Sequence, residues 1–175
     1  MLTRVVFNQK GGVGKSSIAV NLAAISAYQG FKTLLIDLDP QANSSQYLLG
    51  EEAIYAADRP ALQPNIENYF EEVLSSNQSK GLLGNALGSL LKTRSKGLDS
   101  YVHQSPFPNL SVIPASPTLG TLAHALEAKH KIYKLRDALQ QMSAQYERIY
   151  IDTPPAFNVF TLSALIAADR VLIPF

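Results

Sequence analysis

The chain of 175 residues is long enough for one domain with a hydrophobic core and too short for two domains of ordinary size. Its 15 Lys and Arg residues nearly balance its 14 Asp and Glu residues, so the net charge of +1 does not by itself indicate a nucleic acid, a membrane or an acidic partner. The sequence contains no cysteine, which excludes disulfides, thiolate metal sites and iron–sulfur clusters.

The N-terminal part alternates between apolar strands and a helix. Residues 2–7 are apolar and rich in β-branched side chains, which predicts a buried strand. Residues 15–29 predict a helix, because apolar side chains such as Ile25 recur at helical spacing and Gly30 follows as a stop signal. Residues 32–38 predict a second buried strand.

The stretch between residues 51 and 108 is less regular. Residues 65–74 predict a helix that Asn65 caps, because asparagine accepts hydrogen bonds from the first free N–H groups of a helix. Residues 81–91 predict a second helix that its glycines weaken. We expect loops in the rest of this stretch.

The C-terminal part returns to the alternating pattern. Residues 110–113, 148–151 and 170–173 predict three further strands, and residues 118–145 and 158–168 predict helices between them. Continuous apolar strands separated by helices are typical of a parallel sheet covered on both faces. We therefore expect a single α/β domain over residues 1–175.

The stretch NQKGGVGKSS, residues 8–17, lies between the first predicted strand and the first predicted helix and resembles a phosphate-binding loop. Its glycines permit positive φ angles and allow backbone N–H groups to point at phosphate oxygens, and the following helix adds its N-terminal dipole. The loop departs from the standard pattern, since Gln9 replaces the first glycine and Lys10 adds a second lysine to Lys15. The predicted nucleotide-binding residues are Lys10, Gly11, Gly12, Val13, Gly14, Lys15, Ser16 and Ser17.

Carboxylates follow two of the predicted strands. Asp37 and Asp39 end the second strand, and Asp152 follows the fourth. Ligands of open α/β sheets bind at the carboxyl ends of the strands, where an aspartate can hold a magnesium-bound water and another can orient an attacking water. Taken alone, the same aspartates could be helix caps or turn residues.

The motifs KGGVGKS, DLDPQAN and IDTPP, at residues 10–16, 37–43 and 151–155, resemble the ParA/MinD/Soj group of deviant Walker ATPases. The segments NIENYFEEV, VIPAS and YKLRDAL resemble its ParA-type partition branch. The resemblance implies a three-layer P-loop NTPase fold with a mostly parallel sheet in strand order 3-2-4-1-5. It also implies that the strand ending at Asp152 lies beside the strand that precedes the phosphate loop.

The same resemblance implies ATP and Mg²⁺ as ligands and assigns roles to single residues. Lys10 would cross a dimer interface to the nucleotide of the partner subunit, much as an arginine finger does. Lys15 and Asp39 would complete the catalytic group, with Asp39 positioning the attacking water. The expected metal-site residues are Ser16, Asp37 and Asp152.

ParA-like proteins form ATP-dependent sandwich dimers, bind DNA non-specifically and are released when a ParB-like partner stimulates hydrolysis. The resemblance therefore predicts a cytoplasmic, nucleoid-associated protein that partitions a plasmid, a chromosome or other cargo. Basic residues support DNA binding only modestly, since clusters such as Lys129, Lys131, Lys134 and Arg136 are typical of solvated helix faces.

Other functions stay open. The N-terminus lacks the apolar segment of a signal peptide and no apolar run is long enough to cross a bilayer, so we expect a soluble protein without membrane contact. A MinD-like membrane switch would need a C-terminal amphipathic helix, and we see none. A biosynthetic ligase or amidase, or a nucleotide-locked scaffold without turnover, remains possible. Relatives in the group continue beyond a fifth strand, so we expect a fragment that lacks its C-terminal part and exposes an apolar edge strand.

Overall fold

The computed structural model describes residues 1–55, 62–76 and 96–175. Within these residues, six strands form one sheet in the order β3-β4-β2-β5-β1-β6. The strands are β1 (Leu2–Val6), β2 (Thr33–Asp37), β3 (His103–Gln104), β4 (Leu110–Ile113), β5 (Arg148–Asp152) and β6 (Arg170–Leu172). All neighbouring pairs are parallel except β3 and β4.

This topology confirms the predicted strand order 3-2-4-1-5, which corresponds to β4, β2, β5, β1 and β6. Strand β5 lies between β1 and β2, so the strand ending at Asp152 does neighbour the strand that precedes the phosphate loop. The antiparallel edge strand β3 was not predicted, because its two residues are too few to show an apolar period.

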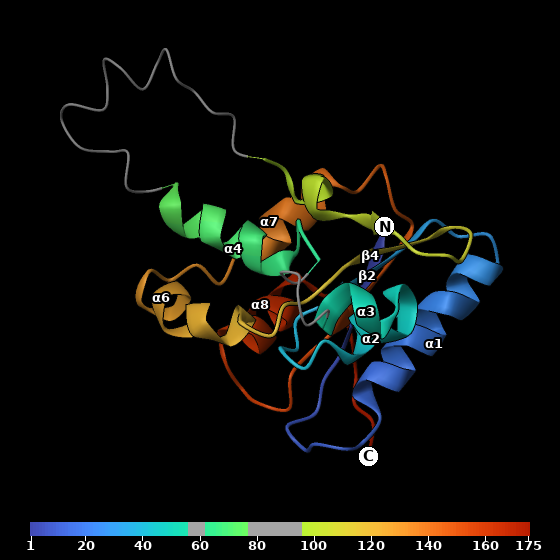
Figure 1. Ribbon diagram of the computed structural model, residues 1–175, viewed down its shortest axis with the longest axis horizontal. Coiled ribbons are helices and arrows are strands. Elements are labelled where there is room, and N and C mark those ends of the chain that lie inside the picture. The colour runs from blue at the N-terminus through green and yellow to red at the C-terminus, as the bar shows by residue number, and fades with distance from the viewer. Residues whose placement is uncertain (56–61, 77–95) are drawn as a thin grey trace, which may run out of the picture.

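Helices cover both faces of the sheet, as expected for a three-layer α/β domain. On one face, α1 and α2 pack against apolar side chains of β1, β2, β4 and β5. On the other, α4, α6, α7 and α8 enclose the larger part of the core (Figure 1). The helices are α1 (Lys15–Tyr28), α2 (Asn43–Leu49), α3 (Glu51–Tyr55), α4 (Ile66–Ser75), α6 (Ala123–Ala128), α7 (Lys134–Gln141) and α8 (Val159–Ala167), with 3₁₀ turns η1 (Leu98–Tyr101) and η2 (Leu119–Leu122).

Helix α1 forms where the sequence predicts it, but alanines rather than the bulky apolar residues are its most deeply buried side chains, since Ile18 and Leu22 are only partly buried. Ala19, Ala23 and Ala27 are almost fully buried against the sheet, whereas 53% of Ile25 is exposed. Alanines spaced four residues apart line one face of a helix, and their short side chains allow the backbone to approach the sheet closely. Small side chains rather than bulky ones therefore decide how α1 docks.

The helix expected over residues 118–145 is divided into η2, α6 and α7. Helix α6 ends because His130 adopts a left-handed conformation with φ of 51°. The N–H of His130 donates to the carbonyl of Glu127 at 3.0 Å, and that of Lys131 donates to the carbonyl of Leu126 at 3.0 Å. This pair of bonds is a Schellman motif, in which histidine takes the place usually held by glycine. The spacing of the apolar residues alone did not predict that the helix ends before His130.

Helix α4 confirms the predicted Asn65 cap. The side chain of Asn65 accepts a hydrogen bond from the N–H of Asn68, and the Asn68 side chain accepts one from the N–H of Asn65. The N–H of Ile66 donates to the carbonyl of Pro114 at 3.0 Å, which fixes the start of α4 to the end of β4. The helix predicted over residues 81–91 lies outside the described residues.

Strand β6 forms one edge of the described sheet, and Val171, Ile173 and Phe175 at this end of the chain are exposed. The pairing of this edge with another segment or another copy stays a prediction. None of the helices in the described parts of the chain combines the length and the apolar character needed to cross a lipid bilayer.

Candidate functional site

The loop over residues 8–14 joins β1 to α1 and has the backbone that its glycines predict. Gly12 and Gly14 have φ angles of 74° and 79°, in the left-handed region that strains other residues. A Cβ atom placed on Gly11, Gly12 or Gly14 would meet no atom of the described residues within 4 Å. One side of the loop is therefore open, and a ligand can approach its backbone closely.

The two lysines of the loop occupy different environments. Lys15 is only 7% exposed, and its ammonium donates a hydrogen bond to the backbone carbonyl of Lys10 at 2.9 Å. The side chain of Lys10 is exposed at the entrance of the loop. The backbone N–H of Lys10 donates to the side chain of Asn8 at 2.9 Å, and Asn8 donates to the carbonyl of Pro174 at 2.7 Å. These bonds attach the loop entrance to the segment after β6.

Asp37 lies directly beside Asp152 at the carboxyl ends of β2 and β5, and both are fully buried. One oxygen of Asp37 accepts the N–H of Asp39 at 3.0 Å, and the other accepts the N–H and the hydroxyl of Ser45 at 2.9 and 2.7 Å. Burial, followed by the charge of Asp152, raises the pKa of Asp37 to about 8 despite these hydrogen bonds. Through these three hydrogen bonds, the side chain of Asp37 connects the end of β2 to the following turn and to α2.

Asp152 differs from Asp37 because one of its carboxylate oxygens is available to a ligand. Its Oδ2 accepts the hydroxyl of Ser44 at 2.7 Å, whereas its buried Oδ1 accepts no hydrogen bond from the described residues. Burial raises the pKa of Asp152, and the hydroxyls of Ser16 and Ser44 oppose that rise. A buried carboxylate oxygen without a donor, close to a hydroxyl, fits a site for Mg²⁺ or for its bound water.

The turn after β2 brings α2 over these strand ends. The side chain of Asp39 accepts the N–H of Gln41 at 2.9 Å, and its carbonyl accepts the N–H of Ala42 at 2.8 Å. Ala42 is buried in the left-handed conformation, with φ of 53°, which reverses the chain direction. Ser44 and Ser45 then face the two carboxylates, a role that the sequence analysis did not predict. Their only signal was two hydroxyl residues directly after the DLDPQAN motif.

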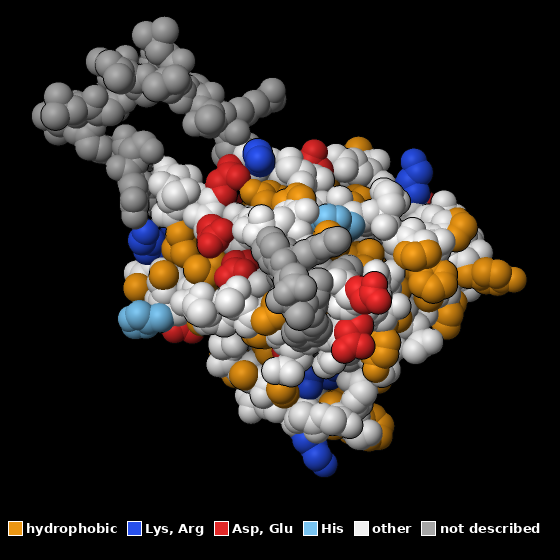
Figure 2. All heavy atoms as spheres, in the orientation of Figure 1, with side chains coloured by type: hydrophobic (Ala, Val, Ile, Leu, Met, Phe, Trp, Pro, Cys, Tyr) orange, Lys and Arg blue, Asp and Glu red, His pale blue; other side chains and the backbone are white. Residues whose placement is uncertain are grey.

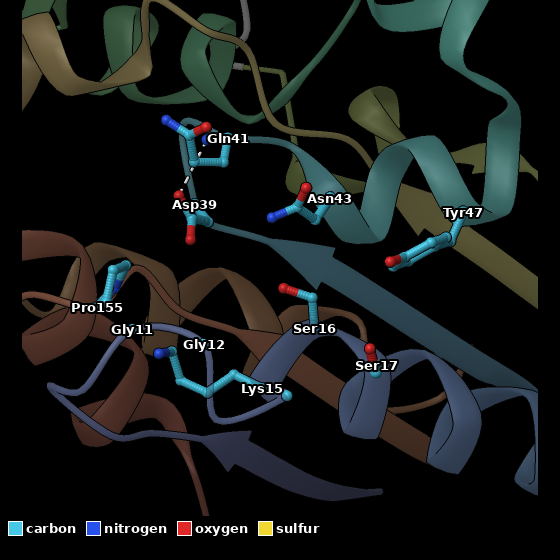
Figure 3. Close-up of a pocket in the computed structure, with 11 residues that line it drawn as sticks. Gly11, Gly12, Lys15, Ser16, Ser17, Asp39, Gln41, Asn43, Tyr47 and Pro155 are labelled. Atoms are coloured by element: carbon cyan, nitrogen blue, oxygen red, sulfur yellow. Dashed lines mark hydrogen bonds between the residues drawn. The ribbon is translucent and has the colours of Figure 1, made fainter.

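A cavity of about 400 Å³ collects most of the predicted site residues (Figure 3). The phosphate loop and the start of α1 form one wall, the turn after β2 and α2 form the opposite wall, and the side chains of Ser16 and Asn43 point from these walls into the space between them. The lining residues are Gly11, Gly12, Gly14, Lys15, Ser16, Ser17, Asp39, Gln41, Asn43, Tyr47 and Pro155. Four of these, Gln41, Asn43, Tyr47 and Pro155, were not assigned to the site from the sequence.

The remaining predicted residues lie around the cavity rather than on its wall. Asp37 and Asp152 are buried at the neighbouring strand ends, Val13 is half-buried within the loop, and Lys10 is exposed at the entrance. The described residues contain no group of three His, Asp or Glu side chains that could hold a metal ion by themselves. The Asp152 carboxylate and the Ser16 hydroxyl suit Mg²⁺, which keeps several waters and binds through one or two protein groups together with phosphate oxygens.

Comparison with known proteins agrees with this geometry. A family model described as an AAA domain (AAA_31) matches residues 2–175. The chromosome partitioning protein ParA of Myxococcus xanthus is 35% identical over 170 residues, which cover 97% of this chain and 50% of that protein. The chromosome-partitioning ATPase Soj of Treponema pallidum is 34% identical over 173 residues, which cover 98% of this chain and 56% of that protein.

Solved structures show the same fold. Cobyrinic acid a,c-diamide synthase from Mycobacterium smegmatis, solved with bound ADP and magnesium, superimposes with a TM-score of 0.75 at 26% identity, covering 100% of this chain and 60% of that one. The chain thus spans about half the length of the two curated relatives. Because the family model covers nearly every residue, the chain belongs to the AAA_31 family of AAA domains and, with ParA and Soj among its relatives, to the ParA/MinD/Soj group.

Proposed function

We propose that this chain is the nucleotide-binding part of a ParA-like ATPase, in which ATP binding and dimerisation occur together. The main support for the proposal is that an open glycine loop and Lys15 face Asp39 across one shared cavity. A triphosphate brings negative charge to such a loop, where backbone N–H groups, the α1 dipole and Lys15 offset it.

Lys15 would bind the terminal phosphates of ATP. Its ammonium already lies over the loop, where the carbonyl of Lys10 holds it at 2.9 Å, and a phosphate oxygen would replace or join that acceptor. Mg²⁺, when bound, neutralises phosphate charge, and Ser16 and Asp152 are the residues that would hold it. Asp37 would act behind them, because its oxygens already accept three hydrogen bonds from the protein.

Asp39 would orient the water that attacks the terminal phosphate. One of its oxygens accepts the N–H of Gln41, which fixes the carboxylate on the cavity wall opposite the phosphate loop (Figure 3). A fixed acceptor there restricts the orientation of a water molecule, and positioning of this kind supplies much of the catalysis of phosphoryl transfer.

Lys10 would act in a second subunit. Within one subunit, Lys15 would already bind the phosphates of the bound ATP. The Lys10 side chain is exposed at the loop entrance and is not needed for that contact. A cation that reaches the partner's nucleotide would neutralise charge on the departing phosphate and would make the homodimer dependent on ATP. The ATP-bound dimer is therefore the proposed active state.

The names of the relatives support a role in partitioning. We extend the proposal to non-specific DNA binding, to a ParB-like activator and to a nucleoid-associated location in the cytoplasm. On the face of the molecule that Figure 2 shows, the Lys and Arg side chains of the described residues stand apart from one another. Of the predicted basic cluster, Lys131 is buried and Lys129 donates to the carbonyl of Leu74. Dimerisation would then be needed to bring enough cations to the phosphates of DNA.

The test is the mass of the protein in solution without nucleotide, with ADP and with ATP and Mg²⁺, each with and without DNA. Light scattering should show a dimer with ATP, and phosphate release should accompany it. A mass that does not respond to nucleotide would contradict the proposal. ATP binding without phosphate release would identify a nucleotide-locked scaffold, and ATP-dependent binding to anionic vesicles would identify a MinD-like switch.

The likeness to the diamide synthase favours one second candidate, an enzyme that uses ATP to activate a carboxylic acid. Phosphate release distinguishes the two functions. Stimulation by a small carboxylic acid and not by DNA would favour the biosynthetic enzyme, whereas stimulation by DNA or by a partner protein would favour the partition ATPase.

A further inference from the structure

Two consecutive serines of α2 are divided between the two buried carboxylates. Ser44 donates to Asp152 at 2.7 Å, and Ser45 donates to Asp37 at 2.7 Å. Both serines are fully buried. We infer that Ser44 is a positioning residue that directs the open oxygen of Asp152 toward Mg²⁺, an inference that rests on the proposed function.

The surroundings of the two serines differ in a way that separates their roles. The hydroxyl of Ser45 donates to Asp37 and accepts the N–H of Ala115 at 3.0 Å, so it joins α2 to the ends of β2 and β4. Asp37 also accepts the N–H of Ser45, and it would remain bonded if that hydroxyl were lost. Ser45 is therefore part of the scaffold of the domain.

Ser44 makes the shortest hydrogen bond to Asp152 that the structure shows, while the Ser16 hydroxyl and the Thr153 N–H lie nearby. The hydroxyl of Ser44 binds Oδ2 of Asp152, and Oδ1 is the buried oxygen without a donor among the described residues. The terminal torsion of an aspartate is broad and roughly two-fold, so a short hydrogen bond to one oxygen strongly favours one of the two orientations. The Ser44 hydroxyl thus assigns Oδ2 to α2 and leaves Oδ1 for the metal site.

Loss of that hydroxyl would also affect Ser16. The hydroxyl of Ser16 lies close enough to Asp152 to lower the pKa of that carboxyl. With Ser44 removed, the Ser16 hydroxyl and the backbone N–H of Thr153 would be the remaining donors close to Asp152, and only Ser16 among them is a mobile side chain. Ser16 would then bind Asp152 more tightly and would be less available to Mg²⁺. The lost orientation of Asp152 and the tighter bond from Ser16 would both weaken the binding of Mg²⁺. Neither change would alter the backbone of the phosphate loop.

The experiment titrates Mg²⁺ into the protein with a fluorescent ATP analogue and measures bound analogue, which does not depend on hydrolysis. We expect Ser44→Ala to raise the half-saturating Mg²⁺ concentration by about 10- to 100-fold, the usual effect of losing an outer partner of a metal ligand. Affinity for the analogue in EDTA should stay unchanged. Ser44→Thr, which keeps the hydroxyl, should restore the Mg²⁺ dependence.

Ser26→Ala is the matched control, because Ser26 is a buried serine whose hydroxyl bonds to the Tyr150 hydroxyl at 2.8 Å. It should leave the Mg²⁺ dependence unchanged. If Ser44→Ala does not fold, Ser44→Val is compared with Ser44→Thr, which has the same shape and keeps the hydroxyl.

A wild-type Mg²⁺ dependence in the folded variant without the hydroxyl would overturn the inference. Equal losses of affinity in EDTA and in Mg²⁺ would overturn it as well, because they indicate general damage to the loop. A wild-type protein whose nucleotide binding ignores Mg²⁺ would instead overturn the proposed function.

Discussion

Repulsion between the paired side chains of Asp37 and Asp152 should lower the free energy of unfolding of the nucleotide-free protein at neutral pH and above. They are partners in register on adjacent strands, and both are fully buried. Asp152→Asn removes one charge while its remaining carbonyl oxygen can still accept the Ser44 hydroxyl. We expect this variant to be more stable than the wild type at pH 8 without nucleotide or metal.

The sign follows from the raised pKa of Asp37. The unfolded chain loses this proton near pH 3.8, whereas the folded protein keeps it up to about pH 8. The folded state binds more protons across this window, so the free energy of unfolding falls as the pH rises through it. The stability that protonated Asp37 contributes is complete below about pH 4 and is lost as the pH rises through about 8.

The size of the stability gain depends on how much of the pKa shift of Asp37 the variant removes. Burial is the largest cause of the raised pKa of Asp37 and persists in Asp152→Asn, whereas the second cause, the charge of Asp152, disappears. If that charge accounts for one pKa unit, its removal is worth at most about 1.4 kcal/mol, a limit that is approached as the pH rises above 8. For a protein of this size, that raises Tm by up to about 3–6 °C, since 1 kcal/mol corresponds to about 2–4 °C.

The assay is urea or thermal unfolding in EDTA, followed by circular dichroism at several values between about pH 5 and 8.5. The difference between Asp152→Asn and the wild type should grow with pH and shrink toward pH 5. Asp99→Asn, at an exposed aspartate, is the control and should show no such trend. An Asp152→Asn protein that is less stable than the wild type at pH 8, or a difference that does not depend on pH, would refute this reasoning.

Three other substitutions test separate parts of the structure. Lys10→Ala should abolish ATP-dependent dimerisation and hydrolysis while retaining some nucleotide binding, and unchanged phosphate release would contradict its role in trans. Asp39→Ala should accumulate an ATP-bound dimer in light scattering, whereas a monomer in ATP and Mg²⁺ would show that Asp39 does not position the water. Phe160→Ala should lower the free energy of unfolding by about 3–5 kcal/mol, because Phe160 is fully buried and packs against Phe70 at 5.6 Å between ring centroids. A loss below about 1 kcal/mol in urea unfolding would show that the core repacks around the cavity.

Local chemistry determined the parts of the molecule that the sequence predicts correctly. Glycines at residues 12 and 14 have the positive φ angles that their motif requires, and Asn65 caps its helix as expected. The five longer strands show up as apolar runs. Strands β1, β2, β4 and β5 are largely buried because helices cover both faces of the parallel sheet, whereas the edge strand β6 is mostly exposed. Each of these features depends on residues that are close together in the chain, so a pattern of residue types can reveal it.

Only the tertiary structure decided which residues meet across the chain. The Ser44–Asp152 bond joins positions 108 residues apart, and the raised pKa of Asp37 depends on a carboxylate from another strand. The buried face of α1 follows Ala23 and its neighbours rather than Ile25, because the distance to the sheet admits small side chains. Such pairings depend on strand register and on packing distance, which composition and spacing do not encode.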